Sequence, residues 1–210
     1  MLRRAERLAL AHGACVIVEL DDAAADAALA ALAGAEQARA AGLGAVRRRA
    51  YVAGRTARRL ALGDAGDPVA AALVADDRGA PVLPPGWIGS VSHKAGVAAA
   101  LVAPAGAGRI GVDLERAAPP RGDIAPRVLT ARELAQLDDR GRGVTLRFSI
   151  KEAIYKAIDP YLRRYVGFTE VELEFAGDAV AVTTALPFAI AATWREHAGH
   201  WLCTAHAVPR

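Results

Sequence analysis

Two acidic side chains, Asp113 and Glu115, stand two residues apart in a segment that predicts a β-strand. Residues 109–116 alternate apolar residues with small or polar ones, which is the period of a strand with one buried face. The two carboxylates therefore share a face and can converge on one hard cation, with Gly111 beside them leaving room for a ligand. The alternative is that these acids only keep an exposed strand soluble.

The segment 148–158 adds a third carboxylate and two lysines to the candidate site. On a helix, its apolar residues form one stripe typical of a face packed on a core: Ile150, Ala153, Ile154, Ala157 and Ile158. Its other stripe carries aromatic and charged residues: Phe148, Lys151, Glu152, Tyr155 and Lys156. Aromatic residues beside charges indicate a cleft. Glu152 would complete an all-oxygen site for Mg²⁺ or Mn²⁺, and the two lysines would face phosphate oxygens.

The order of four motifs resembles the 4′-phosphopantetheinyl transferase family, in the larger single-chain class that includes the enterobactin-synthetase-associated enzymes. Gly111-Val112-Asp113-Leu114-Glu115, followed by Phe-Ser-x-Lys-Glu-Ala-x-x-Lys at residues 148–156, is similar to the paired signature of that family. Residues 81–93, which end in Gly-Ser-Val-Ser-His, resemble its Pro-rich stretch, and residues 47–55 resemble its Arg-Arg…Gly-Arg segment. The resemblance spans roughly residues 46–175.

Two departures from the family pattern are small. Phe148 stands where many members have Trp, and Lys94 follows the Ser-His pair where a small residue is frequent. Neither change removes a chemical group that the reaction of the family needs.

The resemblance implies a defined reaction. The phosphopantetheine arm of coenzyme A would pass to a serine hydroxyl of an apo acyl or peptidyl carrier protein, with release of 3′,5′-ADP. By resemblance, Asp113, Glu115 and Glu152 hold the metal, while Lys151 and Lys156 neutralise phosphate charge. Glu152 and Lys156 are the catalytic candidates, with Glu152 as general base directly or through a water. A metal-bound water or another acid is the alternative base.

The nucleotide of coenzyme A is expected to bind the first half of the chain. By resemblance, Ser92 and His93 contact the 3′-phosphate. Arg48 and Arg55 are two helical turns apart, so both can face a phosphate, and Arg78 is a further candidate. The remaining arginines of this helix are interpreted as solvated surface: Arg47, Arg49, Arg58 and Arg59.

The fold class that we predict is α+β, with helices packed on small, mainly antiparallel sheets. Alanine supplies much of the 53% hydrophobic content, which favours helices. A turn-rich stretch at 103–108 marks a boundary between an N-terminal half, 1–106, and a C-terminal half, 107–210. The resemblance implies that these halves form a pseudo-twofold pair, with coenzyme A in the cleft between them.

The sequence pattern predicts strands and helices in the following segments. Strands are expected near 15–20, 87–92, 96–103, 109–115, 170–175, 179–185 and 200–207. Helices are expected near 23–33, 46–62, 67–75, 130–138 and 145–159.

Composition and charge restrict the location of the protein and its partners. The chain has no run of 18 apolar residues, so we expect no membrane span, and the Arg3-Arg4 start is a poor signal peptide. Two cysteines suit a reducing cytoplasm. We expect a monomer that binds coenzyme A and no nucleic acid. A net charge of +3 either steers an acidic carrier protein or is general surface charge.

Three rival functions use the same residues. Arg47 to Arg59 would suit a nucleic-acid-binding module, although aromatic residues for base stacking are sparse there. The carboxylates would also suit a Mg²⁺-dependent nucleotide hydrolase that needs no carrier protein. A catalytically silent carrier-binding protein is disfavoured by the intact acids and lysines. The sequence does not indicate whether siderophore, polyketide, peptide or fatty acid synthesis is served.

Overall fold

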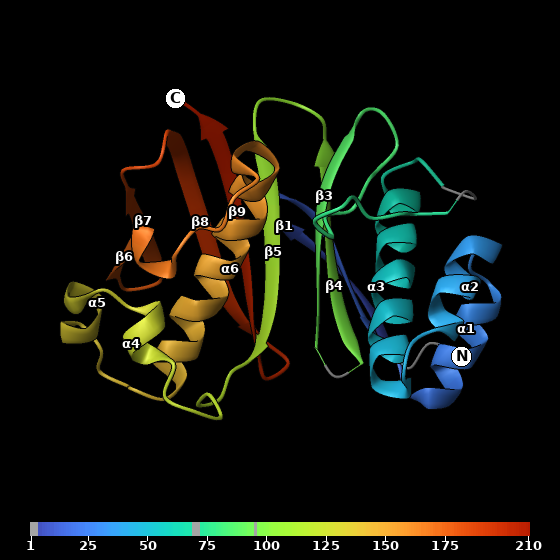
Figure 1. Cartoon of the computed structure of the whole chain (residues 1–210), viewed down its shortest axis with the longest axis horizontal. Helices are drawn as coiled ribbons and strands as arrows, with labels where there is room; N and C mark the ends of the chain where they lie inside the picture. The colour runs from blue at the N-terminus through green and yellow to red at the C-terminus, as the bar shows by residue number, and fades with distance from the viewer. Residues whose placement is uncertain (1–3, 69–71, 95) are drawn as a thin grey trace. The chain divides into compact units, whose positions relative to one another are not determined.

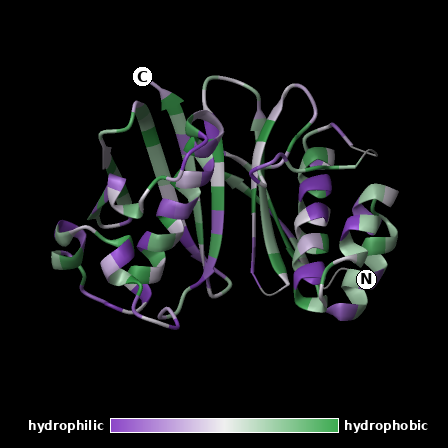
Figure 2. Ribbon diagram, viewed as in Figure 1, coloured by the Kyte–Doolittle hydropathy of each residue, from purple (hydrophilic) through white to green (hydrophobic). Residues whose placement is uncertain are grey.

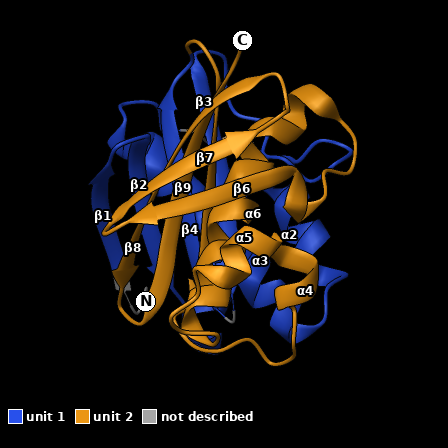
Figure 3. Ribbon diagram, turned by 90° about the vertical axis from the view of Figure 1, so that its left-hand side faces the viewer, with its two compact units in different colours: residues 1–105 blue, residues 106–210 orange. Residues whose placement is uncertain are grey.

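The chain forms two compact units, residues Met1–Ala105 and Gly106–Arg210, in the computed structural model (Figure 3). The structure describes residues 4–68, 72–94 and 96–210. Each unit combines helices with antiparallel strands, which confirms the predicted α+β class. Among the described residues, no helix is long and apolar enough to cross a membrane.

Unit 1 is built on a four-stranded antiparallel sheet with the order β1-β2-β4-β3. Its strands are β1 (Arg4–Leu10), β2 (Gly13–Glu19), β3 (Trp87–Lys94) and β4 (Val97–Pro104). Three helices accompany this sheet: α1 (Asp22–Ala30), α2 (Gly34–Ala41) and α3 (Ala45–Asp64). The long helix α3 lies along the sheet and contacts β2, β3 and β4 (Figure 1).

Helix α3 is amphipathic, and its ribbon carries alternating hydrophobic and hydrophilic bands (Figure 2). Its core face includes Val52, Ala53, Ala57 and Leu62, all fully buried among residues of β2 and β4. Small residues on this face let the helix approach the sheet closely. This packing holds α3, and with it the polar side chains of its other face, close to the sheet.

Unit 2 contains a three-stranded antiparallel sheet, with the order β5-β9-β8, and a two-stranded sheet, β6-β7. Its strands are β5 (Arg109–Arg116), β6 (Val171–Ala176), β7 (Ala179–Thr184), β8 (Phe188–His197) and β9 (His200–Pro209). Its helices are α4 (Ala125–Val128), α5 (Ala131–Ala135), α6 (Arg142–Leu162) and the 3₁₀ turn η1 (Phe168–Glu170). Helix α6 packs on β5 and β9.

The apolar stripe predicted for the 148–158 segment is the buried face of α6. Ile150, Ala153, Ile154, Ala157 and Ile158 are all 0% exposed. The helix ends where Arg163 adopts a left-handed backbone with φ 48°. The predicted strand at 109–115 and helix at 145–159 are thus confirmed, and they contact each other directly.

Several predicted elements differ from the structure. Strands β1 and β8 were not expected, because β1 is a short, charged edge strand and β8 is an alanine-rich strand at the edge of its sheet. The helix expected at 23–33 ends earlier, at Ala30, and is followed by α2. The helix expected near 67–75 includes residues 69–71, which lie outside the described residues, and the described residues beside them are not helical.

Candidate functional site

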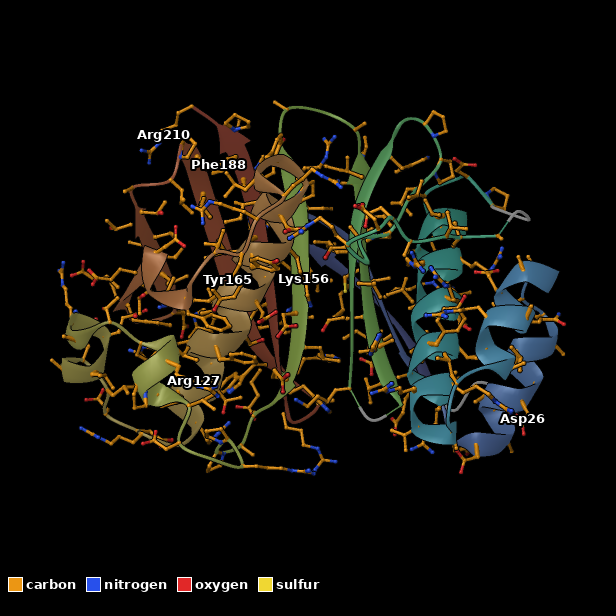
Figure 4. All side chains as sticks on the ribbon, viewed as in Figure 1. Asp26, Arg127, Lys156, Tyr165, Phe188 and Arg210 are labelled. Carbon is orange, nitrogen blue, oxygen red and sulfur yellow. The ribbon has the colours of Figure 1, made fainter. Side chains whose placement is uncertain are left out.

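Asp113 of β5 is held by two side chains of α6. Its Oδ2 accepts a hydrogen bond from Ser149 Oγ at 2.8 Å, and its Oδ1 pairs with Lys156 Nζ at 2.7 Å. Lys156 Nζ also donates to the Val112 carbonyl at 3.0 Å, so the lysine reaches from α6 to β5 (Figure 4). Asp113 is only 4% exposed. The two segments singled out in the sequence therefore meet around this carboxylate.

Gly111 makes this contact between strand and helix possible. A Cβ atom at this position would lie 1.9 Å from the Ala153 carbonyl oxygen of α6. No side chain fits in that space, so only glycine allows the backbones to approach this closely. The prediction that Gly111 leaves room for a ligand is therefore wrong, because the space is filled by the helix.

Glu152, one residue after Lys151 on α6, belongs to the same electrostatic cluster. Burial raises the pKa of the Glu152 carboxyl above its usual range, the charges of Asp113 and Glu115 raise it further, and Lys156 opposes the shift. Asp113 and Glu115 both project on the α6 side of β5, as their spacing of two residues predicts. Three acids and one lysine thus concentrate negative charge beside a buried helix.

The chemistry of this cluster fits a hard divalent cation. Its donors are carboxylate oxygens, which Mg²⁺ and Mn²⁺ prefer, and the pKa of Glu152 is raised first by burial and then by the charges of Asp113 and Glu115. Within residues 4–68, 72–94 and 96–210, however, no three His, Cys, Asp or Glu side chains are already arranged to hold a metal ion. Both oxygens of Asp113 are instead bound by Ser149 and Lys156.

Lys151 does not join the acidic cluster. Its Nζ donates to Glu133 Oε2 at 2.7 Å, to the Val128 carbonyl at 2.8 Å and to the Phe168 carbonyl at 3.0 Å. Because an ammonium has three N–H groups, all of its donors already have acceptors. This geometry disagrees with the predicted contact to phosphate, and it makes Lys151 a tether between α6 and the segments around α5 and η1.

Ser149 is a residue of the site that sequence reasoning did not assign. It is 0% exposed and lies in the middle of a helix, where a buried hydroxyl needs a partner. The sequence offers one indication of its role, which is its position two residues before Lys151 in the motif. Its acceptor, Asp113, comes from a strand that is distant in the sequence. Cys203 of β9 lies in the same buried region, opposite Asp113 in the strand register, and burial raises the pKa of its thiol.

A small apolar pocket of about 170 Å³ opens beside Glu152. Its walls come from α6 and from the segment that follows it, and they include Tyr155, Tyr165, Val166 and Phe168. Tyr165 is 75% exposed and stands at the rim (Figure 4). The pocket therefore offers apolar surface directly next to a catalytic candidate.

Unit 1 contains a larger pocket of about 540 Å³ between α2, α3 and β3. Its basic lining residues are Arg39, Arg47, Arg55, Arg58 and His93. Arg55 stacks over the Tyr51 ring, with Cζ 4.6 Å from the ring centroid. The Nη1 atoms of Arg55 and Arg58 are buried and lack a hydrogen-bond partner. A pocket lined by guanidinium groups with unused donors suits a phosphate-bearing ligand.

The structure brings Arg55 and His93 together at this pocket, as predicted, but not the other nucleotide-binding candidates. Arg48 is not a lining residue, and it pairs with Asp26 of α1. Ser92 is not a lining residue, because successive residues of a strand point to opposite faces and His93 occupies the pocket side. The side chain of Arg78 does not line the pocket either, although its neighbour Gly79 does.

The interpretation of Arg58 as a solvated surface residue is wrong. Arg58 is 4% exposed and lines the pocket, whereas a solvated arginine would extend into water. Arg59 is also largely buried and pairs with the carboxylate of Glu36, which is 2% exposed. Arg47 is exposed but lies on the pocket side of α3.

A buried glutamate performs the same three tasks in each unit. Glu36 accepts from the Ala33 N–H at the start of α2 and from the Leu73 N–H, and it pairs with Arg59 and Arg55 of α3. Glu133 accepts from the Thr130 N–H at the start of α5 and from the Leu173 N–H, and it pairs with Lys151 of α6. Both acids thus join a short helix, an extended segment and a cation on the long helix.

Models of one protein family match both halves of the chain. The 4′-phosphopantetheinyl transferase N-terminal domain matches residues 35–103, and the 4′-phosphopantetheinyl transferase superfamily matches residues 109–208. The two matches leave out residues 1–34, 104–108 and 209–210.

Curated relatives carry the same name. The chain is 38% identical over 133 residues to 4′-phosphopantetheinyl transferase Npt of Nocardia iowensis, covering 61% of this chain and 60% of that protein. It is 33% identical over 146 residues to 4′-phosphopantetheinyl transferase PptT of Mycobacterium tuberculosis, covering 65% and 62%. The matched part thus spans about three fifths of these relatives.

Solved structures of holo-[acyl-carrier-protein] synthases are more distant. The enzyme of Helicobacter pylori in complex with coenzyme A has a TM-score of 0.40 and 17% identity, and the match covers 47% of this chain and 98% of that one. That of Thermotoga maritima has a TM-score of 0.40 and 22% identity, covering 50% and 64%. Similarity at this level has no bearing on function. From the two family models, which match most of its length, the chain belongs to the 4′-phosphopantetheinyl transferase superfamily.

Proposed function

We propose that this protein transfers the 4′-phosphopantetheine arm of coenzyme A to a serine hydroxyl of an apo acyl or peptidyl carrier protein, releasing 3′,5′-ADP. One observation carries the proposal: Asp113 and Glu115 of β5 share an electrostatic cluster with Glu152 and Lys156 of α6, in a chain of this family. Phosphoryl transfer needs groups that position the reactants and balance phosphate charge, and this cluster contains both kinds.

Asp113, Glu115 and Glu152 are the residues that would hold Mg²⁺ or Mn²⁺. When bound, the metal ion would neutralise charge on the pyrophosphate of coenzyme A. Ser149 keeps Asp113 oriented through its hydrogen bond to Oδ2, which leaves the other oxygen of that carboxylate facing Lys156. An orienting partner of this kind stabilises one geometry of a ligating carboxylate.

Glu152 is our candidate for the general base that accepts the proton of the carrier serine. Its raised pKa makes it a better proton acceptor than an ordinary surface carboxylate. Lys156 is partly exposed, with 27% of its side chain accessible, so its ammonium can reach a phosphate oxygen of a bound ligand. Its two roles would be to stabilise Asp113 and to balance charge on the leaving group.

Each unit has a pocket whose chemistry suits one part of coenzyme A. The arginine-lined pocket of unit 1 has the charge for the nucleotide phosphates. The apolar pocket beside Glu152 has the surface for part of the pantetheine arm. We thus propose one assignment for the pocket of unit 1 and another for the pocket of unit 2. Cys15 and Cys203 are buried free thiols, which suits activity in a reducing compartment such as the cytoplasm.

Intact-mass spectrometry of apo carrier proteins tests the proposal. A panel of acyl and peptidyl carriers is incubated with the protein, coenzyme A and Mg²⁺, with a chelator in parallel. We expect at least one carrier to gain the mass of one phosphopantetheine, and expect the chelator to prevent the gain. No gain on any carrier would contradict the proposal, and nucleotide turnover without a carrier would point to a hydrolase.

A further inference from the structure

The segment between α6 and η1 forms one wall of the apolar pocket of unit 2. Its consecutive lining residues are Tyr165, Val166, Gly167 and Phe168. Two charged residues, Arg164 and Glu170, flank this segment and are not among the lining residues. The shape of the wall therefore depends on what holds the segment near its two ends.

Arg164 and Glu170 form a bidentate ion pair that closes this segment into a loop. Nη1 and Nη2 of Arg164 donate to Oε1 and Oε2 of Glu170 at 3.2 Å and 2.8 Å. Two parallel hydrogen bonds fix the relative orientation of the two side chains as well as their distance. An exposed ion pair usually contributes little, but a bidentate pair of arginine and carboxylate is an exception.

The same two side chains also bind the backbone of the loop. Arg164 Nη1 donates to the Tyr165 carbonyl at 2.7 Å, and Glu170 Oε1 accepts from the Gly167 N–H at 2.8 Å. The hydrogen bond from Arg164, and then that from the Gly167 N–H, lower the pKa of the Glu170 carboxyl, so the acid is ionised at neutral pH. The ion pair thus holds two lining residues, Tyr165 and Gly167, by their main chain.

The other two lining residues of the loop are held from the interior of unit 2. Val166 is 7% exposed and belongs to the hydrophobic core, and the Phe168 carbonyl accepts from Lys151 Nζ at 3.0 Å. Tyr165 is 75% exposed, so burial does not fix its position. The placement of the Tyr165 ring at the rim of the pocket depends instead on the Arg164–Glu170 pair.

We infer that Arg164 and Glu170 are positioning residues for the apolar part of the substrate: their ion pair holds Tyr165 and Gly167 in place as the rim of the apolar pocket. The pair thereby sets the affinity for the ligand portion that enters this pocket, and it leaves the affinity for the nucleotide portion unchanged. The identification of the pocket ligand as the pantetheine arm of coenzyme A rests on the proposed function. The role of the pair in ordering the loop does not.

Calorimetric titration of the full chain tests the inference without a transfer reaction. Coenzyme A and 3′,5′-ADP are titrated into the wild type, Arg164→Gln, Glu170→Gln and the double variant, with Mg²⁺ in every buffer. The wild type should bind coenzyme A more tightly, because only coenzyme A carries the arm. Each single variant should weaken coenzyme A about 3- to 10-fold and leave 3′,5′-ADP unchanged. The double variant should lose no more than either single variant, because the two side chains act as one pair.

Limited proteolysis with chymotrypsin follows the order of the loop with no ligand added. Tyr165 is an exposed aromatic residue at which this protease can cut. Both single variants should be cut after Tyr165 faster than the wild type, because the loop has lost its ion pair. Mass spectrometry of the fragments identifies the cleavage site.

Arg132→Gln is the matched control, because it breaks another exposed ion pair of unit 2, with Glu174, and Arg132 is not a lining residue. It should bind both ligands, and be cut after Tyr165, as the wild type is. Equal losses for the two ligands, an unchanged preference for coenzyme A in both single variants, or a wild type without that preference would overturn the inference. Unchanged cleavage after Tyr165 in both single variants would overturn it as well. A wild type whose preference for coenzyme A depends on the ion pair, but that modifies no carrier protein, would contradict the proposed function alone.

Discussion

Lys151 and Glu133 form an ion pair of 2.7 Å in which the two side chains are 2% and 0% exposed. Burial lowers the pKa of the Lys151 ammonium, and the hydrogen bond that it donates to Glu133 opposes this shift. Removing one partner of such a pair leaves an uncompensated charge in the interior, which typically costs about 3–5 kcal/mol.

We therefore expect Lys151→Met to destabilise the protein by about 3–5 kcal/mol in urea unfolding, because Glu133 loses its cation. Lys151→Met combined with Glu133→Gln should recover part of that loss, since the neutral glutamine leaves no uncompensated charge in the interior. The recovery should be incomplete, because Leu173 and Thr130 donate to different oxygens of Glu133 and a glutamine keeps only one of them. A Lys151→Met variant of unchanged stability, with weaker coenzyme A binding, would instead restore the role of Lys151 as a phosphate ligand.

Glu152→Gln should lower kcat/KM for carrier modification about 10²- to 10⁴-fold, the usual contribution of a general base. Nucleotide binding should persist, because the arginine pocket belongs to the other unit. Product formation is measured by mass spectrometry and 3′,5′-ADP affinity by calorimetry. Glu174→Gln is the control, since Glu174 is an exposed acid paired with Arg132. Wild-type turnover in Glu152→Gln would remove this residue from the mechanism.

Ser149→Ala should remove the hydrogen bond that orients Asp113 and leave the charge of Asp113 in place. The substitution leaves Asp113 Oδ2 without its donor in a buried position, which we expect to cost about 1–3 kcal/mol of stability. Loss of an orienting partner should also weaken binding of Mn²⁺, followed by electron paramagnetic resonance, about 10- to 100-fold. Metal affinity equal to that of the wild type would show that Ser149 serves packing alone.

Gly111→Ala should disrupt the contact between β5 and α6, because the new Cβ would lie 1.9 Å from the Ala153 carbonyl oxygen. We expect a loss of at least about 3 kcal/mol, at the upper end of overpacking effects, and loss of transfer activity. Gly106→Ala is a close control, since nothing lies within 4 Å of its added Cβ. Equal stability of the two variants, measured by thermal unfolding, would contradict this account of the site.

Local periodicity was sufficient to predict the two elements that build the acidic cluster. The helix period around Glu152 gives the correct buried face, because that face is decided within about ten residues. The strand period around Asp113 gives the element but not its burial, because both faces of β5 are buried from Ile110 to Leu114. The assignment of Asp113, Glu152 and Lys156 to one site depends in addition on the family resemblance of the two motifs, because periodicity alone does not bring two elements together.

Residues whose environment depends on distant partners could not be assigned in this way. Lys151 was expected to face phosphate, but its acceptor Glu133 comes from another helix. Arg48 and Arg58 differ by less than three helical turns, and only the position of Asp26 on α1 shows which of them is already paired. Periodicity indicates the face of a helix, and it does not indicate what covers that face.

Glu36 and Glu133 occupy matching positions in the two units, but the cations that pair with them differ in side-chain type. In unit 2 the acid meets a lysine, whose three N–H groups are all consumed by fixed acceptors. In unit 1 the acid meets arginines, and Arg55 keeps Nη1 free of any acceptor while its Nε lies 3.7 Å from Glu36. A guanidinium has enough N–H groups to pair with the buried acid and also to bind a further acceptor. An ammonium whose three N–H groups are all bonded can only hold the acid in place. The same buried acid therefore holds a cation that keeps an unused donor in unit 1 and a cation whose donors are all used in unit 2.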